Sequence, residues 1–238
     1  MRKINKGKLW GVGVGPGDSE LMTLKAVRLI EQCDLVVVPD SKKRYVALEI
    51  AKGAVPSLLE KEILKVHMPM TKDKKRMEEA HLEAAKVIGD ELDKGKNLVF
   101  LTLGDPTVYS TYFYVHKAVE AAGYNCEIVP GITSFCAAAA KMGVSLSEGK
   151  EGIYIMPGTY ENVPKGLKVP GTKVIMKSGK SIGEIKNYLE KNEGMYSTYM
   201  IENCSMDDEK IYRNAGEIPE DAGYFSLLIV KDREEIDG

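Results

Sequence analysis

Glycines occupy every second position from 11 to 17, in the order Gly-Val-Gly-Val-Gly-Pro-Gly, and Asp18 follows them. The apolar residues before this run predict a strand that ends in a loop with almost no side chains. Glycine tolerates positive φ and lets a ligand lie against the main chain, while Asp18 or Ser19 can cap a helix that we expect to reach Ile30. This order of strand, loop and helix favours a nucleotide-like ligand.

Two common phosphate-binding patterns do not fit the loop. In the dinucleotide fingerprint, Pro16 replaces the third glycine when the pattern starts at Gly11, and Asp18 replaces it when the pattern starts at Gly13. The P-loop pattern fails because no Gly-Lys-Ser/Thr closes the run. For this loop alone, a turn that only lets strand and helix pack closely is an equal alternative.

Two further segments repeat the arrangement of strand, small-residue loop and helix. Segment 103–107 reads Leu-Gly-Asp-Pro-Thr after an apolar stretch, and segment 130–134 reads Pro-Gly-Ile-Thr-Ser after another. Ligands bind at the carboxyl ends of strands in an open parallel sheet, so the three loops should open on one edge. Each motif by itself is also typical of a simple turn.

The elements that must position these loops alternate between strand and helix patterns up to about residue 145, which predicts a parallel α/β sheet. Strands are expected at 8–14, 34–38, 62–67, 97–103 and 125–129. Helices are expected over 77–92, 108–122 and 136–140.

Segment 143–152 is rich in Ser, Gly, Lys and Glu, which indicates a linker. We therefore place an N-terminal α/β domain at 1–146 and a C-terminal one at 147–238. In the second domain we expect strands at 152–156, 172–176, 196–201, 209–213 and 224–230, and helices at 160–167 and 181–192. The last strands follow one another too closely for helices between them, which predicts antiparallel pairing and hence a mixed sheet.

The composition indicates an ordinary globular protein of 238 residues, 44% hydrophobic and 29% charged. A net charge of −2 gives no overall attraction to nucleic acid, and no apolar run is long enough to cross a bilayer. The basic start leads into a glycine-broken strand and not into a signal peptide, so we expect a cytoplasmic location. The cysteines are too far apart for a structural zinc site and are expected to be reduced thiols; they are Cys33, Cys126, Cys136 and Cys204.

The three loop motifs, at 13–18, 103–106 and 130–134, together resemble the tetrapyrrole methylase superfamily, and the resemblance spans nearly the whole chain. Within it, four segments resemble the precorrin-2 or cobalt-factor-2 C(20)-methyltransferases of cobalamin biosynthesis. These segments are 68–73 (Met-Pro-Met-Thr-Lys-Asp), 104–111, 156–159 (Met-Pro-Gly-Thr) and 224–228 (Tyr-Phe-Ser-Leu-Leu).

The resemblance implies two α/β domains with S-adenosylmethionine in the cleft between them, S-adenosylhomocysteine as the product, and a homodimer. It also implies the residues that contact this cofactor: Gly15, Pro16, Gly17, Leu103, Gly104, Asp105, Val108, Tyr109, Thr133, Ser134, Met176 and Cys204. Asp105 is equally well explained as a helix cap. The pattern does not identify a catalytic residue. Asp105 and Tyr109 are the candidates that it offers.

The implied substrate is a macrocycle with several carboxylates, so basic residues are the candidate contacts. We hypothesise that Lys42, Lys43, Arg44 and Lys72 pair with these carboxylates, although solvated turns explain each of them equally well. Tyr112, three residues after Tyr109, is expected on the same helix face, where the two rings can flank the macrocycle, although tyrosines at this spacing are more often core and rim residues. No metal ligand is expected from the protein, and the sequence does not distinguish a metal-free from a cobalt-loaded ring.

Two alternatives stay open at this point. The first is another tetrapyrrole methylase that acts on a different corrin carbon or on uroporphyrinogen III, against which segment 68–73 argues. The second is a nucleotide-binding module without turnover.

Overall fold

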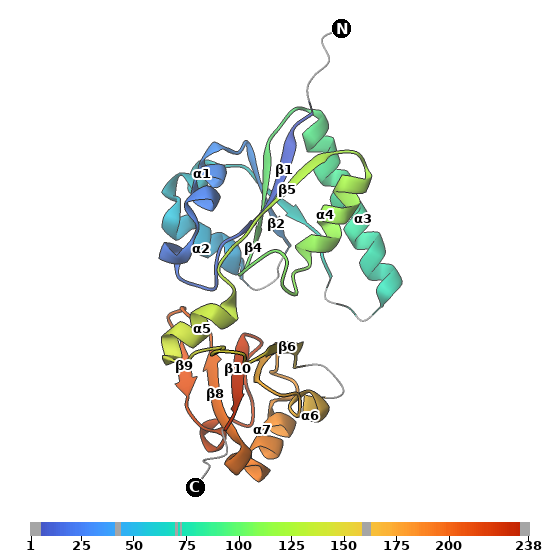
Figure 1. Ribbon diagram of the computed structural model, residues 1–238. Helices are drawn as coiled ribbons and strands as arrows, with labels where there is room; N and C mark the ends of the chain where they lie inside the picture. The colour runs from blue at the N-terminus through green and yellow to red at the C-terminus, as the bar shows by residue number, and fades with distance from the viewer. Residues whose placement is uncertain (1–5, 41–43, 70, 72, 159–162, 234–238) are drawn as a thin grey trace. The chain divides into compact units, whose positions relative to one another are not determined.

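The computed structural model describes residues 6–40, 44–69, 71, 73–158 and 163–233, and it divides into two compact units (Figure 1). The first unit is Met1–Thr133 and the second is Ser134–Gly238. This division falls 13 residues before the expected domain boundary at residue 146, because helix α5 (Ser134–Met142) packs against strand β10 of the second unit (Figure 1).

The first unit contains a five-stranded parallel sheet in the order β3-β2-β4-β1-β5. Its strands are β1 (Lys8–Gly13), β2 (Leu35–Pro39), β3 (Ile63–Val66), β4 (Leu98–Thr102) and β5 (Asn125–Val129). Each expected strand is present with ends shifted by two residues or fewer. The parallel order is confirmed, and β1 lies between β4 and β5. These three strands lead into the motif loops.

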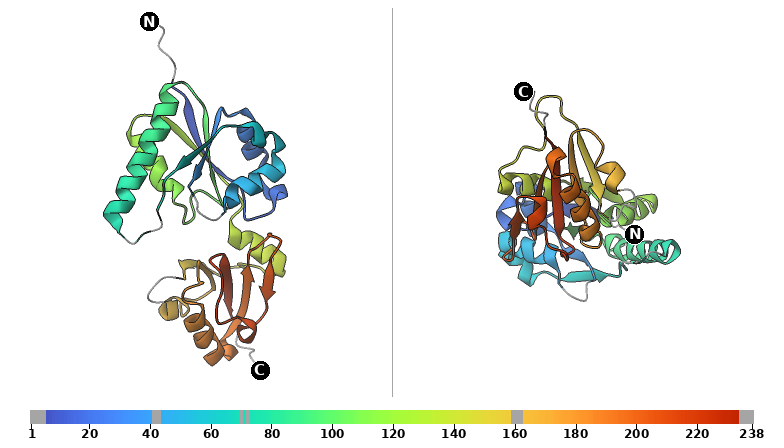
Figure 2. Two further views of the ribbon diagram at one scale, coloured as in Figure 1. Left: turned by 180° about the vertical axis from the view of Figure 1, so that it is seen from behind. Right: turned by 90° about the horizontal axis from the view of Figure 1, so that it is seen from below.

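Helices cover both faces of this sheet (Figures 1 and 2). One face packs against α1 (Leu24–Gln32) and α2 (Val46–Ala54), and the other against α3 (Lys74–Asp93) and α4 (Tyr112–Ala121). Successive strand residues point to opposite faces, so Val36 lies in the first core cluster and Val37 in the second. Short 3-10 turns, η1 (Ser19–Leu21) and η2 (Pro56–Glu60), complete the unit.

Two of the expected helices differ from the structure, and α2 was not among the expected ones. Helix α4 begins at Tyr112 and not at 108, because Gly104 and Tyr109 adopt left-handed φ values of 68° and 48° that keep segment 103–111 out of a helix. The helix expected up to Ile30 is divided into η1 and α1, which are capped by Asp18 and Thr23 respectively.

The second unit contains a mixed five-stranded sheet in the order β6-β7-β10-β8-β9. The strands are β6 (Ile153–Pro157), β7 (Thr172–Met176), β8 (Tyr196–Glu202), β9 (Lys210–Tyr212) and β10 (Ser226–Asp232). Strands β6 and β7 are parallel, whereas β10 is antiparallel to both β7 and β8, which confirms the antiparallel pairing expected near the end of the chain. Helices α6 (Val163–Gly166) and α7 (Ile182–Lys191) and the turn η4 (Ala215–Glu217) contribute to one core cluster with the sheet, and the turn η3 (Glu193–Met195) precedes β8.

Gly11 makes room for a side chain of the protein's own core. A Cβ atom on Gly11 would lie 1.9 Å from the ring of Tyr112. That ring is fully buried against Phe100, and its hydroxyl is 2.9 Å from Nδ1 of His116. The first glycine of the run is therefore explained by packing, without a ligand.

We expect Gly11→Ala to lower the free energy of unfolding by about 1–3 kcal/mol, because the buried Tyr112 ring has no space to move away. Urea denaturation followed by circular dichroism measures this change. Gly183→Ala in α7 is the control, since its Cβ would have only Glu220 O nearby, at 3.8 Å, and should be neutral or stabilising. Equal stability of Gly11→Ala and the unchanged protein would contradict the packing argument.

Candidate functional site

The three motif loops lie at one edge of the first sheet, as expected, because β1, β4 and β5 are adjacent and parallel. We call segments 14–18, 103–111 and 130–133 the first carboxyl edge. Two loops of this edge are joined directly: Gly104 N donates to Gly15 O at 2.8 Å, and Gly15 N donates to Gly104 O at 3.3 Å.

Glycines allow the main chains of these loops to touch. A Cβ on Gly13 would lie 2.5 Å from Gly104 O, and a Cβ on Gly131 would lie 2.2 Å from the same oxygen. Backbone atoms cannot yield as a flexible side chain can, so a larger residue at either position would separate the loops. Gly13 and Gly131 are therefore required by loop packing itself.

Asp105 joins the second and third loops through its side chain, which is 8% exposed. Its Oδ1 accepts hydrogen bonds from Thr107 N at 2.8 Å and Thr107 Oγ1 at 2.5 Å, and its Oδ2 accepts one from Gly131 N at 3.0 Å. Both carboxylate oxygens are thus engaged within the first unit. The structure shows Asp105 holding two loops together, which goes beyond the expected helix cap.

Other features of the first carboxyl edge indicate a ligand. The place that a Cβ on Gly104 would take has no atom within 4 Å, so the main chain there is open. The hydroxyl oxygen of Thr133 is buried and has no hydrogen-bond partner among the described residues. A buried polar atom without a partner is costly, and a bound molecule would satisfy it.

Tyr109 has a backbone conformation that supports the same interpretation. Its φ of 48° is rare for a residue with a large side chain, and the side chain is 41% exposed. Such strained conformations gather at functional sites. The other predicted contacts of the first unit are part of the same loops: Gly15, Pro16, Gly17, Leu103 and Val108.

The second unit has a comparable edge. Strands β7 and β8 are both antiparallel to β10, so they run in the same direction and end at the same edge. Met176 is the last residue of β7, and Cys204 follows the end of β8, so the two predicted contacts share this edge. We call residues 176–178, 202–205 and 223–225 the second carboxyl edge.

Strained backbone is concentrated at the second carboxyl edge. Lys177, Asn203 and Ser205 have φ values of 58°, 50° and 62°. Four residues other than glycine have positive φ in the described part of the chain, and Tyr109 is the fourth. The strain therefore coincides with the two edges where the sequence places candidate ligand contacts.

Burial raises the pKa of the Cys204 thiol, the side chain of which is 7% exposed. A thiol in this environment stays protonated near neutral pH, and a protonated thiol is a poor nucleophile. Cys204 is therefore suited to packing against a ligand and not to attacking one.

Two exposed aromatic residues complete the second carboxyl edge. Tyr224 and Phe225 are 50% and 37% exposed and pack edge to face with ring centroids 5.2 Å apart. The Lys177 ammonium lies 5.9 Å from the centroid of the Tyr224 ring, and Asn203 N donates to Phe225 O at 3.2 Å. An exposed aromatic pair beside a cation can bind a flat anionic molecule.

Sequence reasoning did not select Tyr224, Phe225 or Lys177 as site residues. Segment 224–228 entered only as a motif of resemblance. The available signal was two aromatic residues directly before the apolar stretch of β10, at the same edge as the end of β7. That signal needs the strand order, because the two segments are about fifty residues apart in the chain.

The structure corrects the expectation for Tyr112. Tyr109 lies in the loop and Tyr112 starts α4, so they do not share a helix face. The Tyr112 ring is fully buried in the core, where it cannot contact a macrocycle. Burial also raises the pKa of its phenol well above the ordinary value.

The basic candidates are only partly described. Lys42, Lys43 and Lys72 lie outside the described residues. Arg44 is exposed, and its Nε is 2.5 Å from Glu49 Oε2 in α2. This ion pair balances the charge of Arg44 at least in part, which weakens the expectation that it recognises substrate carboxylates.

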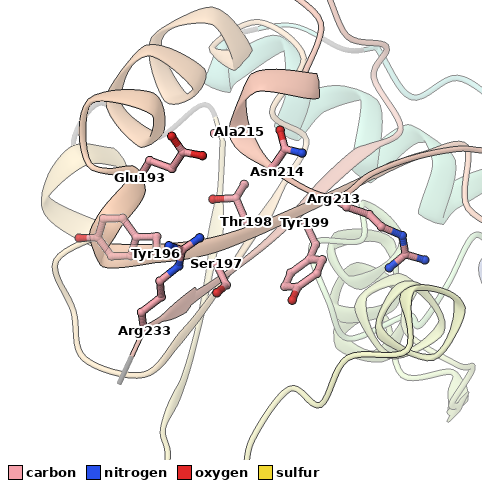
Figure 3. A pocket seen from close by; sticks show the side chains of 9 residues that line it. All are labelled: Glu193, Tyr196, Ser197, Thr198, Tyr199, Arg213, Asn214, Ala215 and Arg233. Carbon is pink, nitrogen blue, oxygen red and sulfur yellow. The ribbon is translucent and has the colours of Figure 1, made fainter. Parts of the chain in front are cut away.

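A polar cavity of about 130 Å³ lies at the other end of β8, beside Tyr196 and Thr198 (Figure 3). Its two arginines do not converge: Arg233 lies beside Tyr196, whereas Arg213 Nη1 donates to Met142 O at 3.1 Å (Figure 3). Since β8 runs from this cavity to Cys204, the cavity is not part of the second carboxyl edge.

Comparison with known proteins gives the family. The family model for tetrapyrrole (corrin/porphyrin) methylases matches residues 8–219, and the protein belongs to this family. A probable cobalt-precorrin-2 C(20)-methyltransferase from Methanocaldococcus jannaschii is 36% identical to it over 97% of this chain and 98% of its own. A precorrin-2 C(20)-methyltransferase from Sinorhizobium sp. is 28% identical over 98% of this chain and 100% of its own.

A solved structure supports the fold. The uroporphyrin-III C-methyl transferase from Thermus thermophilus in complex with S-adenyl homocysteine has a TM-score of 0.68 at 24% identity and covers 94% of this chain and 97% of that one. The expected resemblance and the expected pair of α/β units, one parallel and one mixed, are confirmed. Within the described residues, none of the helices combines the length and apolar character needed to cross a membrane.

We expect Asp105→Asn to destabilise the protein by about 1–3 kcal/mol, because an amide has one acceptor oxygen and leaves either Gly131 N or Thr107 without its partner. The specific readout is faster hydrogen exchange of the Gly131 amide, measured by NMR. Asp73→Asn is the matched control: Asp73 caps α3 by accepting from Arg76 N, and asparagine caps a helix equally well. Unchanged exchange at Gly131 would refute the role of Asp105 in joining the loops.

Proposed function

We propose that this protein transfers a methyl group from S-adenosylmethionine to carbon 20 of precorrin-2 or its cobalt complex, a step of cobalamin biosynthesis. The observation that carries the proposal is the similarity, over nearly the whole chain, to two proteins named for this reaction. The alternative of a nucleotide-binding module without turnover has no comparable support, because both relatives are named as enzymes.

The residues of the first carboxyl edge suit S-adenosylmethionine. Open main chain at Gly104 and the unpartnered hydroxyl of Thr133 supply space and a polar contact. The residues proposed to hold the cofactor are Gly15, Pro16, Gly17, Leu103, Gly104, Val108, Tyr109 and Thr133 from the first unit, with Ser134, Met176 and Cys204 from the second. When bound, S-adenosylmethionine supplies a methyl group already activated by the positive charge on sulfur.

The chain's own contribution is then placement. Alignment of two reactants in one site is worth about 7–11 kcal/mol in favourable cases, so no protein nucleophile is needed. Asp105 is engaged with Thr107 and Gly131, and we assign it to positioning the loops and not to proton transfer. Tyr109, exposed on its strained loop, is proposed to contact the bound molecules directly.

The second carboxyl edge is proposed to hold the tetrapyrrole. Tyr224 and Phe225 are nearly perpendicular, so a flat macrocycle can stack on the face of one exposed ring and meet the edge of the other, and Lys177 is placed to pair with one of its carboxylates. Arg44 and Lys72 stay proposals for further carboxylate contacts. A homodimer and a cytoplasmic location also stay predictions.

The direct test is an anaerobic assay with S-adenosylmethionine and either reduced precorrin-2 or its cobalt complex. We expect one methyl group to be added, detected by mass spectrometry and located at carbon 20 by NMR. Comparison of the two rates identifies the metal state of the substrate. Methylation of uroporphyrinogen III alone would favour another methylase, and uptake of S-adenosylmethionine without methylation would favour the binding module.

We expect Tyr224→Ala to raise KM for the tetrapyrrole about tenfold, because one of the two exposed rings proposed to contact the macrocycle is lost. The affinity for S-adenosylhomocysteine, measured by calorimetry, should stay unchanged. Tyr114→Ala is the matched control, since Tyr114 is 56% exposed but stacks on His81 in the first unit. A KM equal to that of the unchanged protein would remove Tyr224 from the substrate site.

A further inference from the structure

We infer that Glu202 is a positioning residue that sets the affinity for the tetrapyrrole without contacting it. The inference rests on the proposed function, because it concerns the residues proposed there to hold the macrocycle. Glu202 ends β8 and is 9% exposed, and nothing in the proposed reaction uses its carboxylate. A carboxylate so deeply buried needs a structural or functional reason.

The hydrogen bonds of Glu202 reach the turn that carries the aromatic pair. Its Oε1 accepts from Gly223 N at 2.8 Å, directly before Tyr224. Ser226, directly after Phe225, has its Oγ 3.5 Å from the same carboxylate oxygen and donates to Gly223 O at 2.6 Å. The two ends of segment 223–226 are thus fixed to each other and to Glu202.

The other carboxylate oxygen fixes Glu202 itself. Its Oε2 accepts from the hydroxyl of Tyr212 in β9 at 2.9 Å. Burial and the neighbouring carboxylate raise the pKa of the Tyr212 phenol, so this hydroxyl remains a donor. Glu202 therefore connects β8, β9 and the aromatic turn from a position inside the sheet.

Glu202 also adjoins the strained segment of the same edge. The next residue, Asn203, has a φ of 50° and donates its N–H to Phe225 O at 3.2 Å. Strained residues persist only where the surroundings fix them, and the Glu202 bonds supply that constraint at this edge. Loss of the carboxylate would free the turn, so that Tyr224 and Phe225 would have to be ordered again at each binding event.

Removal of the carboxylate should weaken the binding of the tetrapyrrole more than the binding of the cofactor. Glu202→Ala leaves Gly223 N and the Tyr212 hydroxyl without partners, and we expect KM for the tetrapyrrole to rise about tenfold. The affinity for S-adenosylhomocysteine should change by less than the KM, because the hydrogen bonds of Glu202 go to the aromatic turn and to Tyr212, and most of the proposed cofactor contacts lie at the first carboxyl edge. Glu202→Gln should restore most of the affinity, since its amide oxygen accepts from Gly223 N and its NH₂ group donates to Tyr212.

Glu151→Ala is the matched control. Glu151 accepts from Thr172 Oγ1 at 2.8 Å and pairs with Lys231 at 3.3 Å, at the start of β7 and so at the opposite end of that strand from Met176. Its loss should lower stability without raising KM for the tetrapyrrole. A similar rise of KM in Glu151→Ala would show that general loosening of the unit suffices, and it would overturn the inference.

The remaining outcomes distinguish failure of this inference from failure of the proposed function. If the unchanged protein methylates the tetrapyrrole and Glu202→Ala keeps its KM, the inference fails while the proposed function stands. If the unchanged protein binds S-adenosylmethionine but methylates no tetrapyrrole, the proposed function itself fails. Should Glu202→Ala not fold, Tyr212→Phe and Ser226→Ala each remove part of the same network and should raise KM by a smaller factor, and a KM unchanged in both would refute the role.

Discussion

Direct contact between main chains at the ends of β1, β4 and β5 is the constraint on which the site depends. Gly13 and Gly131 both face Gly104 O at distances that exclude any side chain. Gly15 and Gly104 exchange two hydrogen bonds, and Asp105 adds a third connection through Gly131 N. Only a parallel sheet with β1 between β4 and β5 brings these three loops together.

The second unit builds its edge by other means. Its turns are held by side chains, chiefly Glu202, and by residues with strained backbone, and its exposed surface consists of rings and an ammonium group. One edge therefore offers peptide groups and a small hydroxyl, and the other offers large side chains. In the proposed function, most cofactor contacts lie at the first edge, and the macrocycle, which differs between members of the family, is held at the second.

Much of the fold follows from sequence, because strands buried on both faces are continuous apolar runs, and the expected strands match the observed ones closely. The common edge of the three motif loops also follows, since it needs only parallel order. Helix α2 was not expected, because its segment 46–54 has no side-chain cap at Tyr45. The late start of α4 could not be predicted, because tyrosine has no preference for the left-handed φ that Tyr109 adopts.

The site was predicted less completely than the fold. Gly13 and Gly131 belong to motifs that were expected to border a ligand, but neighbouring backbone explains both of these glycines. Tyr112 was placed beside the macrocycle because the expected helix was assumed to include Tyr109, which lies in the loop before α4. The roles of Glu202 and Tyr224 depend on contacts between β8, β9 and the turn before β10, which no local pattern encodes.

The use of main chain at the first carboxyl edge has a consequence for how such enzymes diverge after gene duplication. Peptide groups are present whatever the neighbouring side chains are, so most point mutations leave that edge unaltered as long as its glycines persist. The aromatic and charged side chains at the second carboxyl edge, in contrast, are replaced by single amino-acid substitutions. Under the proposed assignment of the two edges, a duplicated copy can thus acquire a preference for a different macrocycle while keeping its methyl donor.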